Sequence, residues 1–127
     1  MAITTPAAQV AMSETDEIPI VCSAVTDPVA AEVVSDMEKP GGNVTGTSDA
    51  ISVETIMGLA EEITPGFKTV GALYNSSETN SVAAIESLRT SAAENSLELV
   101  ESAITSANEI QPAAQNIAQN CDIVLSP

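Results

Sequence analysis

Three short polar segments follow apolar runs of the sequence, and they hold the side chains that could bind a small ligand. They are Thr26-Asp27-Pro28, the region around Ser48-Asp49, and residues 74–81. Their carboxylates could accept hydrogen bonds from an ammonium group, whereas hydroxyls, amides and the free N–H groups at the start of a helix could hold a carboxylate. This combination suits a zwitterion such as an amino acid.

The same residues also have structural interpretations. Asp27 precedes a proline and Ser81 precedes an apolar helical pattern, and both positions are typical of helix caps. Tyr74 at the end of an apolar run is typical of partly buried packing, and Asp49 and Glu78 of solvated loop carboxylates. By spacing alone these structural roles are the more frequent ones, so the polar side chains do not by themselves establish a binding site.

The composition excludes several classes of protein. The chain has no histidine, which excludes Ser-His-Asp and Cys-His catalytic groups because nothing can take the proton. The glycines do not have the spacing of a phosphate-binding loop, and C-x-x-C is absent, so we expect no metal and no cofactor. Three basic residues against 18 acidic ones give a net charge of −15, which argues against nucleic-acid binding. We expect the protein not to be an enzyme.

Cys22 and Cys121 each lie in an apolar, strand-like run, which favours free thiols over a disulfide.

The positions of the polar segments depend on a regular alternation of strands and helices. A helix over 28–37 would place Val29, Val33 and Met37 on one face. We predict strands at 18–25, 43–48, 69–74, 97–104 and 121–125, and helices at 28–37, 52–63, from Ser81 onward, and at 106–119.

This alternation predicts an α/β fold with a parallel sheet and right-handed crossovers. Ligands bind such sheets at the carboxyl ends of the strands, which is where the three polar segments fall. A chain of 127 residues is too short for two complete lobes around a cleft. Residues 1–12 have neither the pattern of a signal peptide nor that of a membrane span.

Three longer stretches, taken in order, resemble a family of ABC-importer substrate-binding proteins. They are PIVCSAVTDPVAAEVV (19–34), KPGGNVTGTSD (39–49) and TVGALYNSSETNSVAAIESL (69–88). In that family a V-T-D-P-V turn, a P-G-G-N-[VI]-T-G-x-S-D crossover and an L-Y-N-x-x-E-x-N-S loop recur in this order. The resemblance covers residues 19–127 and rests on three ordered motifs, which is more specific than any one of them.

The resemblance implies a fragment of a two-lobed, type 1 periplasmic-binding protein that closes around a small polar solute such as an amino acid. Residues 1–41 would end the first lobe, 42–49 would cross between lobes, and 50–127 would begin the second, both lobes being incomplete. The family implies an extracytoplasmic protein that docks on the membrane permease of an ABC importer. Carried over by position, the ligand-binding residues would be Thr26, Asp27, Asp49, Tyr74, Asn75, Glu78, Asn80 and Ser81.

Several segments of the family pattern are not recognised near the two ends of this sequence. The family has an export signal or a lipid-attachment cysteine, a first βαβ half before Pro19, and further strands after Leu125, and we identify none of these in the sequence. Such a fragment would leave sheet edges and apolar helix faces uncovered, so we expect association or marginal stability.

Two other classes of protein remain as alternatives. A small flavodoxin-like signalling or receiver-type domain fits the length and the alternation, but it needs an acidic cluster after the first strand and a lysine near the last. Lys39 and Lys68 fit neither place. An enzyme on the same architecture would have to use metal-dependent phosphotransfer, which a magnesium-dependent thermal shift would reveal.

Overall fold

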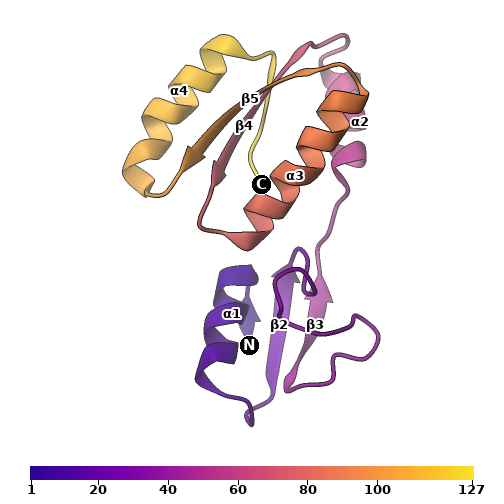
Figure 1. The fold of residues 1–127 in the computed structure, drawn as a ribbon, viewed down its shortest axis with the longest axis vertical. Coiled ribbons are helices and arrows are strands. Elements are labelled where there is room, and N and C mark those ends of the chain that lie inside the picture. Colours follow the sequence, from indigo (N-terminus) through magenta and orange to yellow (C-terminus); the bar gives the residue numbers. More distant parts are fainter. The chain divides into compact units, whose positions relative to one another are not determined.

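The computed structural model describes residues 1–127, which form two compact units (Figure 1). The N-terminal unit spans Met1–Ile51 and the C-terminal unit spans Ser52–Pro127. Both contain a three-stranded parallel sheet. The predicted α/β class is confirmed.

The N-terminal unit has its strands in the order β1-β2-β3. Its elements are β1 (Ala2–Ile3), α1 (Thr5–Glu14), β2 (Ile20–Val25) and β3 (Val44–Ser48). Strand β1 and helix α1 were not predicted from the sequence, in which no part of the family's first βαβ half was recognised before Pro19. The reason is that β1 has two residues and α1 buries only Thr5 and Ala8, so neither element has a clear periodicity.

The helix predicted over 28–37 is wrong, because the segment makes one turn and then leaves the helical path. The turn is closed by a hydrogen bond from the Ala31 N–H to the Asp27 carbonyl at 3.0 Å. Glu32 then adopts a left-handed conformation with φ of 56°, which a helix cannot continue through. The expected apolar face does not form, since Val33 is buried whereas Val29 and Met37 are exposed.

The core of the N-terminal unit lies on one face of its sheet. Strand alternation sends Ala2, Ile20, Cys22 and Val44 to the buried face, where Ala8 of α1 packs. The opposite face carries side chains that remain half exposed, 53% for Ile3 and 51% for Val21.

The C-terminal unit has the strand order β5-β4-β6 with a helix in each crossover. Figure 1 shows α3 and α4 with the strands between them. All predicted strands and helices of this unit are present, with shifted ends. The elements are α2 (Val53–Ile63), β4 (Thr69–Asn75), α3 (Thr79–Glu94), β5 (Glu98–Ile104), a 3-10 turn (Ala107–Glu109), α4 (Ile110–Asn120) and β6 (Ile123–Leu125).

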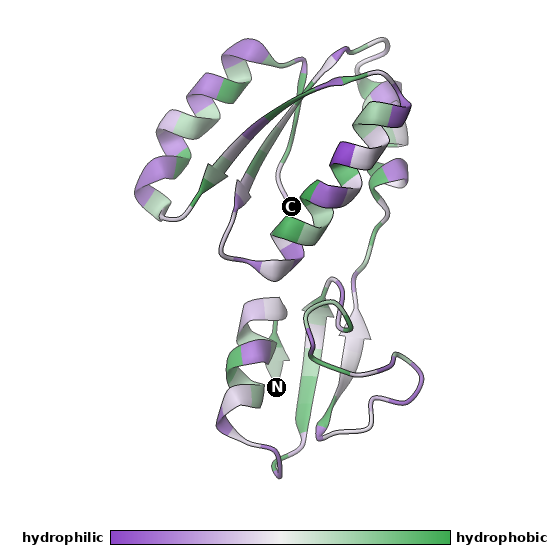
Figure 2. Ribbon diagram, in the orientation of Figure 1, coloured by the Kyte–Doolittle hydropathy of each residue, from purple (hydrophilic) through white to green (hydrophobic).

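Helices cover both faces of this second sheet. Val70 and Ala72 of β4 point into a core that includes Leu88 of α3. Between them, Gly71 points the other way, where an added Cβ atom would come within 2.3 Å of Ile117 on α4. Figure 2 shows alternating hydrophilic and hydrophobic bands along α3 and α4, as expected for helices that bury one face.

Asp122 fastens β6 to β4 at the amino-terminal ends of these strands. Its Oδ2 accepts hydrogen bonds from the backbone N–H groups of Lys68 (2.8 Å) and Thr69 (2.9 Å) and from the Thr69 hydroxyl (2.9 Å). The N–H groups of Lys68 and Thr69, followed by the Thr69 hydroxyl, hold the pKa of Asp122 below its usual range.

Cys22 and Cys121 are both free thiols, which confirms the interpretation favoured from the sequence. No helix of the structure has both the length and the apolar character needed to cross a membrane.

Candidate functional site

The carboxyl ends of the three parallel strands of the N-terminal unit lie along one edge of its sheet. This edge carries Thr26 and Asp27 after β2 and Asp49 after β3, so the structure brings these three predicted residues to the same edge. The Ser48 hydroxyl donates to the Thr26 carbonyl at 3.0 Å, which ties the two segments together.

Asp27 has the capping role that its position before proline predicted. Its Oδ1 accepts hydrogen bonds from the N–H groups of Val29 (3.1 Å) and Ala30 (2.9 Å). The side chain is exposed, and its second carboxylate oxygen makes no hydrogen bond within the chain. Asp49 is also exposed. At this edge, therefore, carboxylate oxygens are available to a cationic group.

At the carboxyl end of β4, Asn75 builds the turn that leads into α3. Its Oδ1 accepts from the Ser77 N–H at 3.0 Å, and its Nδ2 donates to Glu78 Oε1 at 2.8 Å. The Glu78 N–H donates to the Asn75 carbonyl at 3.2 Å. Two of the predicted ligand residues, Asn75 and Glu78, thus contact each other directly.

Ser81 does not cap the helix as predicted. Helix α3 begins at Thr79 with Glu78 in the N-cap position, and Ser81 lies inside the first turn with 2% of its surface exposed. Because of the turn at Asn75, the N-cap is Glu78, three residues earlier than the predicted Ser81.

Asn80, in the first turn of α3, has a buried side-chain oxygen without a hydrogen-bond partner. A buried polar atom in this state is costly, and one explanation is a partner that the chain itself does not supply. The chain has only one other buried side-chain oxygen without a partner, Oγ1 of Thr5 in the first turn of α1.

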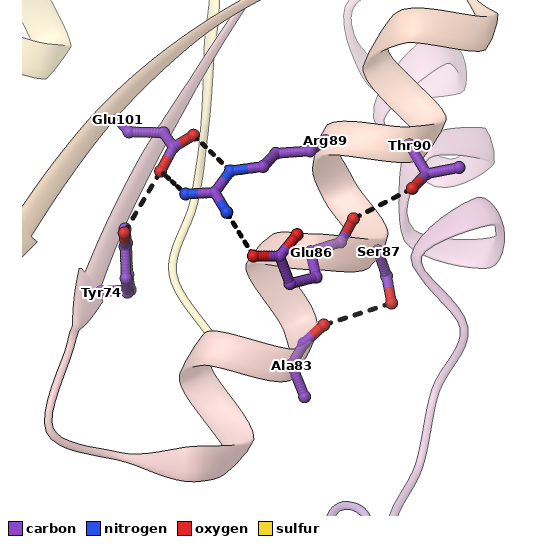
Figure 3. Close-up of polar contacts among 7 residues, drawn as sticks. All are labelled: Tyr74, Ala83, Glu86, Ser87, Arg89, Thr90 and Glu101. Carbon is purple, nitrogen blue, oxygen red and sulfur yellow. Dashed lines mark hydrogen bonds and ion pairs between the residues drawn. The ribbon is translucent and has the colours of Figure 1, made fainter.

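Tyr74 is held by an ion-pair network (Figure 3). Its hydroxyl donates to Glu101 Oε2 at 3.2 Å, and Arg89 donates to both oxygens of that carboxylate, at 2.8 and 2.7 Å. Arg89 also pairs with Glu86. The hydrogen bond from Arg89 lowers the pKa of Glu101 and, reciprocally, raises the pKa of Arg89. The Tyr74 ring is partly buried, so the network fixes the end of β4.

Sequence reasoning missed Arg89 and Glu101. The Glu86–Arg89 spacing on α3 is a signal for an ion pair, but Glu101 lies on β5 and joins them only through the parallel pairing of β4 and β5. No group of three or more His, Cys, Asp or Glu residues lies close enough together to hold a metal ion.

Comparison with known proteins identifies related chains. The family model for ABC transporter substrate-binding proteins matches residues 1–127. A tyrosine-binding protein of Clostridioides difficile is 43% identical over 126 residues, which are 99% of this chain and 36% of that protein.

Two solved structures are also similar. A conserved domain protein from Vibrio cholerae is 45% identical, with a TM-score of 0.91 over 96% of this chain and 41% of that one. An ABC domain from Streptococcus pneumoniae in complex with L-tryptophan is 40% identical, with a TM-score of 0.91 over 98% of this chain and 42% of that one. The chain therefore spans less than half the length of these relatives.

Proposed function

This chain belongs to the family of ABC transporter substrate-binding proteins, and we propose that the full-length protein binds an amino acid, preferably tyrosine or tryptophan. The observation that supports this solute is the high identity to a tyrosine-binding protein and to a domain with bound L-tryptophan, 43% and 40% respectively. The flavodoxin-like signalling alternative is not proposed, because the family model covers the whole chain.

The polar groups at the strand ends support a zwitterionic solute. In the N-terminal unit, the proposed ligand residues are Thr26, Asp27 and Asp49, whose carboxylates suit an ammonium group. In the C-terminal unit they are Tyr74, Asn75, Glu78, Asn80 and Ser81. Among the latter, Asn80 has the strongest physical support, because its buried oxygen lacks a partner in the chain.

The remaining parts of the proposal follow from the family. The full-length protein would act outside the cytoplasm, deliver its solute to the membrane permease of an ABC importer, and carry out no catalysis. The absence of histidine supports the last point for imidazole-based chemistry.

Isothermal titration of the full-length protein tests the proposal. We expect saturable binding of L-tyrosine or L-tryptophan in preference to L-alanine and L-glutamate. Asp27→Asn and Asn80→Ala should each weaken binding about tenfold or more, as expected when a hydrogen bond to a charged group is lost.

The matched control is Thr90→Val, on the exposed side of α3, which should bind as the wild type does. Absence of binding for every amino acid tested would contradict the proposed function. Unchanged affinity in both ligand-residue variants would contradict the residue assignment alone.

A further inference from the structure

The network of Arg89, Glu101 and Tyr74 ends next to the turn that carries proposed ligand residues of the C-terminal unit (Figure 3). Tyr74 directly precedes Asn75, the residue that builds this turn. We propose that Arg89 and Glu101 are positioning residues for solute binding, which act through the Tyr74 hydroxyl to hold the turn in its binding geometry. This inference rests on the proposed function and adds to it two residues that do not contact the solute.

The first observation behind the proposal is that Arg89 is selective in its partners. The chain has three basic residues against 18 acidic ones, yet both ion pairs in the structure belong to Arg89, whereas Lys39 and Lys68 form none. The Nε and Nη2 groups of Arg89 donate to the two oxygens of Glu101 at 2.8 and 2.7 Å. A planar guanidinium group can make this two-pronged contact, which fixes the direction of the carboxylate, and a lysine ammonium group cannot.

Folding stability alone does not account for this contact. The side chains of Arg89 and Glu101 are 43% and 28% exposed, and ion pairs in contact with water contribute little to stability. The contact does restrict the direction of both side chains. Its geometric effect is therefore larger than its energetic one, and the group that Glu101 then holds is the Tyr74 hydroxyl, at 3.2 Å.

The strand register shows what this hydrogen bond holds in place. In the parallel pairing of β4 and β5, Glu101 lies opposite Ala72 and Tyr74 lies opposite Ala103, so the Glu101 and Tyr74 side chains point to the same face of the sheet. The hydrogen bond between them runs diagonally across the two strands and restrains the Tyr74 side chain against β5. Because Arg89 belongs to α3, three elements meet at this carboxylate.

The turn after Tyr74 is tied to β5 by a second contact. The Ser76 N–H donates to the Ile104 carbonyl at the end of β5 at 3.0 Å. Asn75 therefore has a neighbour on each side that is bound to β5, Tyr74 through its side chain and Ser76 through its backbone.

This restraint extends to the start of α3. Asn75 donates to Glu78, the N-cap residue of the helix, and Asn80 lies in the first turn with a buried oxygen that has no partner in the chain. A polar group that is already held in place binds a ligand more tightly, because less conformational entropy is lost on binding. The network thus prepares the turn for the solute without touching it.

Isothermal titration of the full-length protein with L-tyrosine and L-tryptophan tests the inference. Glu101→Gln leaves one acceptor oxygen for two donors, Arg89→Lys keeps the positive charge but loses the two-pronged contact, and Tyr74→Phe keeps the ring and removes only the hydroxyl. We expect each to weaken binding about three- to tenfold, the effect of one hydrogen bond. The matched control is Glu86→Gln, which removes the other ion pair of Arg89, leaves the path to Tyr74 intact and should bind as the wild type does.

A double variant separates positioning through the hydroxyl from a general structural role. Tyr74→Phe combined with Glu101→Gln should bind as each single variant does, because both changes break the same path. The melting temperatures of the ligand-free variants should stay close to that of Glu86→Gln, since all of them change only exposed polar contacts. If Glu101→Gln does not fold, Arg89→Lys combined with Tyr74→Phe gives the same comparison.

Three results would overturn the inference alone, each with a wild type that binds tyrosine or tryptophan. They are wild-type affinity in Glu101→Gln and Arg89→Lys, losses of affinity that add up in the double variant, and a loss in Glu86→Gln as large as that in Glu101→Gln. A wild type that binds no amino acid would overturn the proposed function as well.

Discussion

The two units use the same parallel three-stranded sheet but cover it differently. In the C-terminal unit, helices pack on both faces, with Leu88 of α3 on one side and Ile117 of α4 on the other, both fully buried. In the N-terminal unit the core lies on one face, and Ile3 and Val21 on the opposite face are about half exposed. The second sheet is therefore a complete layered structure, and the first is a sheet with one open face.

The connections explain this difference. Both β4–β5 and β5–β6 are joined through helices long enough to cover the sheet, whereas β2 and β3 are joined by a single turn and an irregular segment. Because β-strand side chains alternate between faces, a sheet without a second helical layer must expose half of its apolar residues or receive a cover from elsewhere. We therefore expect the open face to contribute little to stability.

Truncation of one apolar side chain in each unit gives the largest expected contrast. Leu88→Ala removes a fully buried side chain from the covered core and should reduce the free energy of unfolding by about 2–5 kcal/mol. Val21→Ala on the open face should cost about 1 kcal/mol or less, because much of the side chain is already in water. Denaturant unfolding of the full-length protein measures both, and equal costs would show that the open face is covered in the complete protein.

Two mid-strand glycines, one in each unit, should respond differently to alanine. A Cβ atom at Gly46 would lie 2.0 Å from the Cys22 carbonyl oxygen, a backbone atom, whereas at Gly71 the nearest atom belongs to the Ile117 side chain. Each substitution should cost about 1–3 kcal/mol or more from overpacking, with Gly46→Ala the more severe.

The Gly71→Ala cost should fall when Ile117→Ala is added, so that the double variant is more stable than the sum of the single costs predicts. Additive costs would contradict the steric explanation. No neighbouring side-chain truncation is expected to rescue Gly46→Ala, because the obstacle there is backbone.

Acid should weaken the C-terminal unit through three of its carboxyl groups. The pKa values of Glu101, Glu109 and Asp122 are lowered by hydrogen bonds, from Arg89, from the Thr105 N–H and from the Lys68 N–H respectively. A group with a lowered folded pKa stabilises the fold above its unfolded pKa, and this stabilisation is lost as the pH falls through the folded value. Stability should thus be retained above about pH 5 and decline below about pH 4.

Unfolding measurements between pH 6 and pH 3 check this, with Asp122→Asn as the variant. The amide keeps one acceptor oxygen but does not take up a proton between pH 6 and pH 3. The stability of the variant should therefore depend less steeply on pH than that of the wild type. An equal dependence of stability on pH in the variant and the wild type would show that Asp122 does not contribute to the loss of stability in acid.

The smallest expected effect concerns the cysteines, one in each unit. Cys22 is 3% exposed and Cys121 is partly exposed, so a thiol reagent should modify Cys121 first. Burial, and then the negative charges of Asp122 and Glu98, raise the pKa of Cys121, which makes its labelling slow at neutral pH and faster as the pH rises above about 9. Mass spectrometry of the labelled peptides follows both sites, and earlier labelling of Cys22 would mean that the N-terminal unit opens more readily.

The sequence predicted the C-terminal unit well because its pattern is local. The helix that begins after Ser52 and the strand over 69–74 each follow a clear periodicity with Gly, Pro or capping residues at the ends. In the N-terminal unit, the left-handed conformation of Glu32 and the two-residue strand β1 have no local signal. Strand β1 exists through its pairing with β2, a contact between distant residues that a single sequence does not reveal.

The site was only partly predictable for the same reason. The positions of Thr26, Asp27, Asp49 and Asn75 at strand ends follow from the alternation, and the structure places them there. The contact between Tyr74 and Glu101, and the unpaired hydroxyl of Thr5, arise from tertiary packing. The family motifs pointed to the first group and to Tyr74, but not to Glu101 or Thr5.

The strand order of the C-terminal unit also constrains the order of folding events during synthesis. The central strand β4 pairs with β5 and β6, both of which follow it in the chain, and its contact with Asp122 joins residues 53 positions apart. A growing chain therefore leaves one side of β4 unpaired until residues up to Leu125 have left the ribosome. Non-local parallel pairing of this kind folds slowly, so a chaperone that holds the chain extended would have most to protect in this segment.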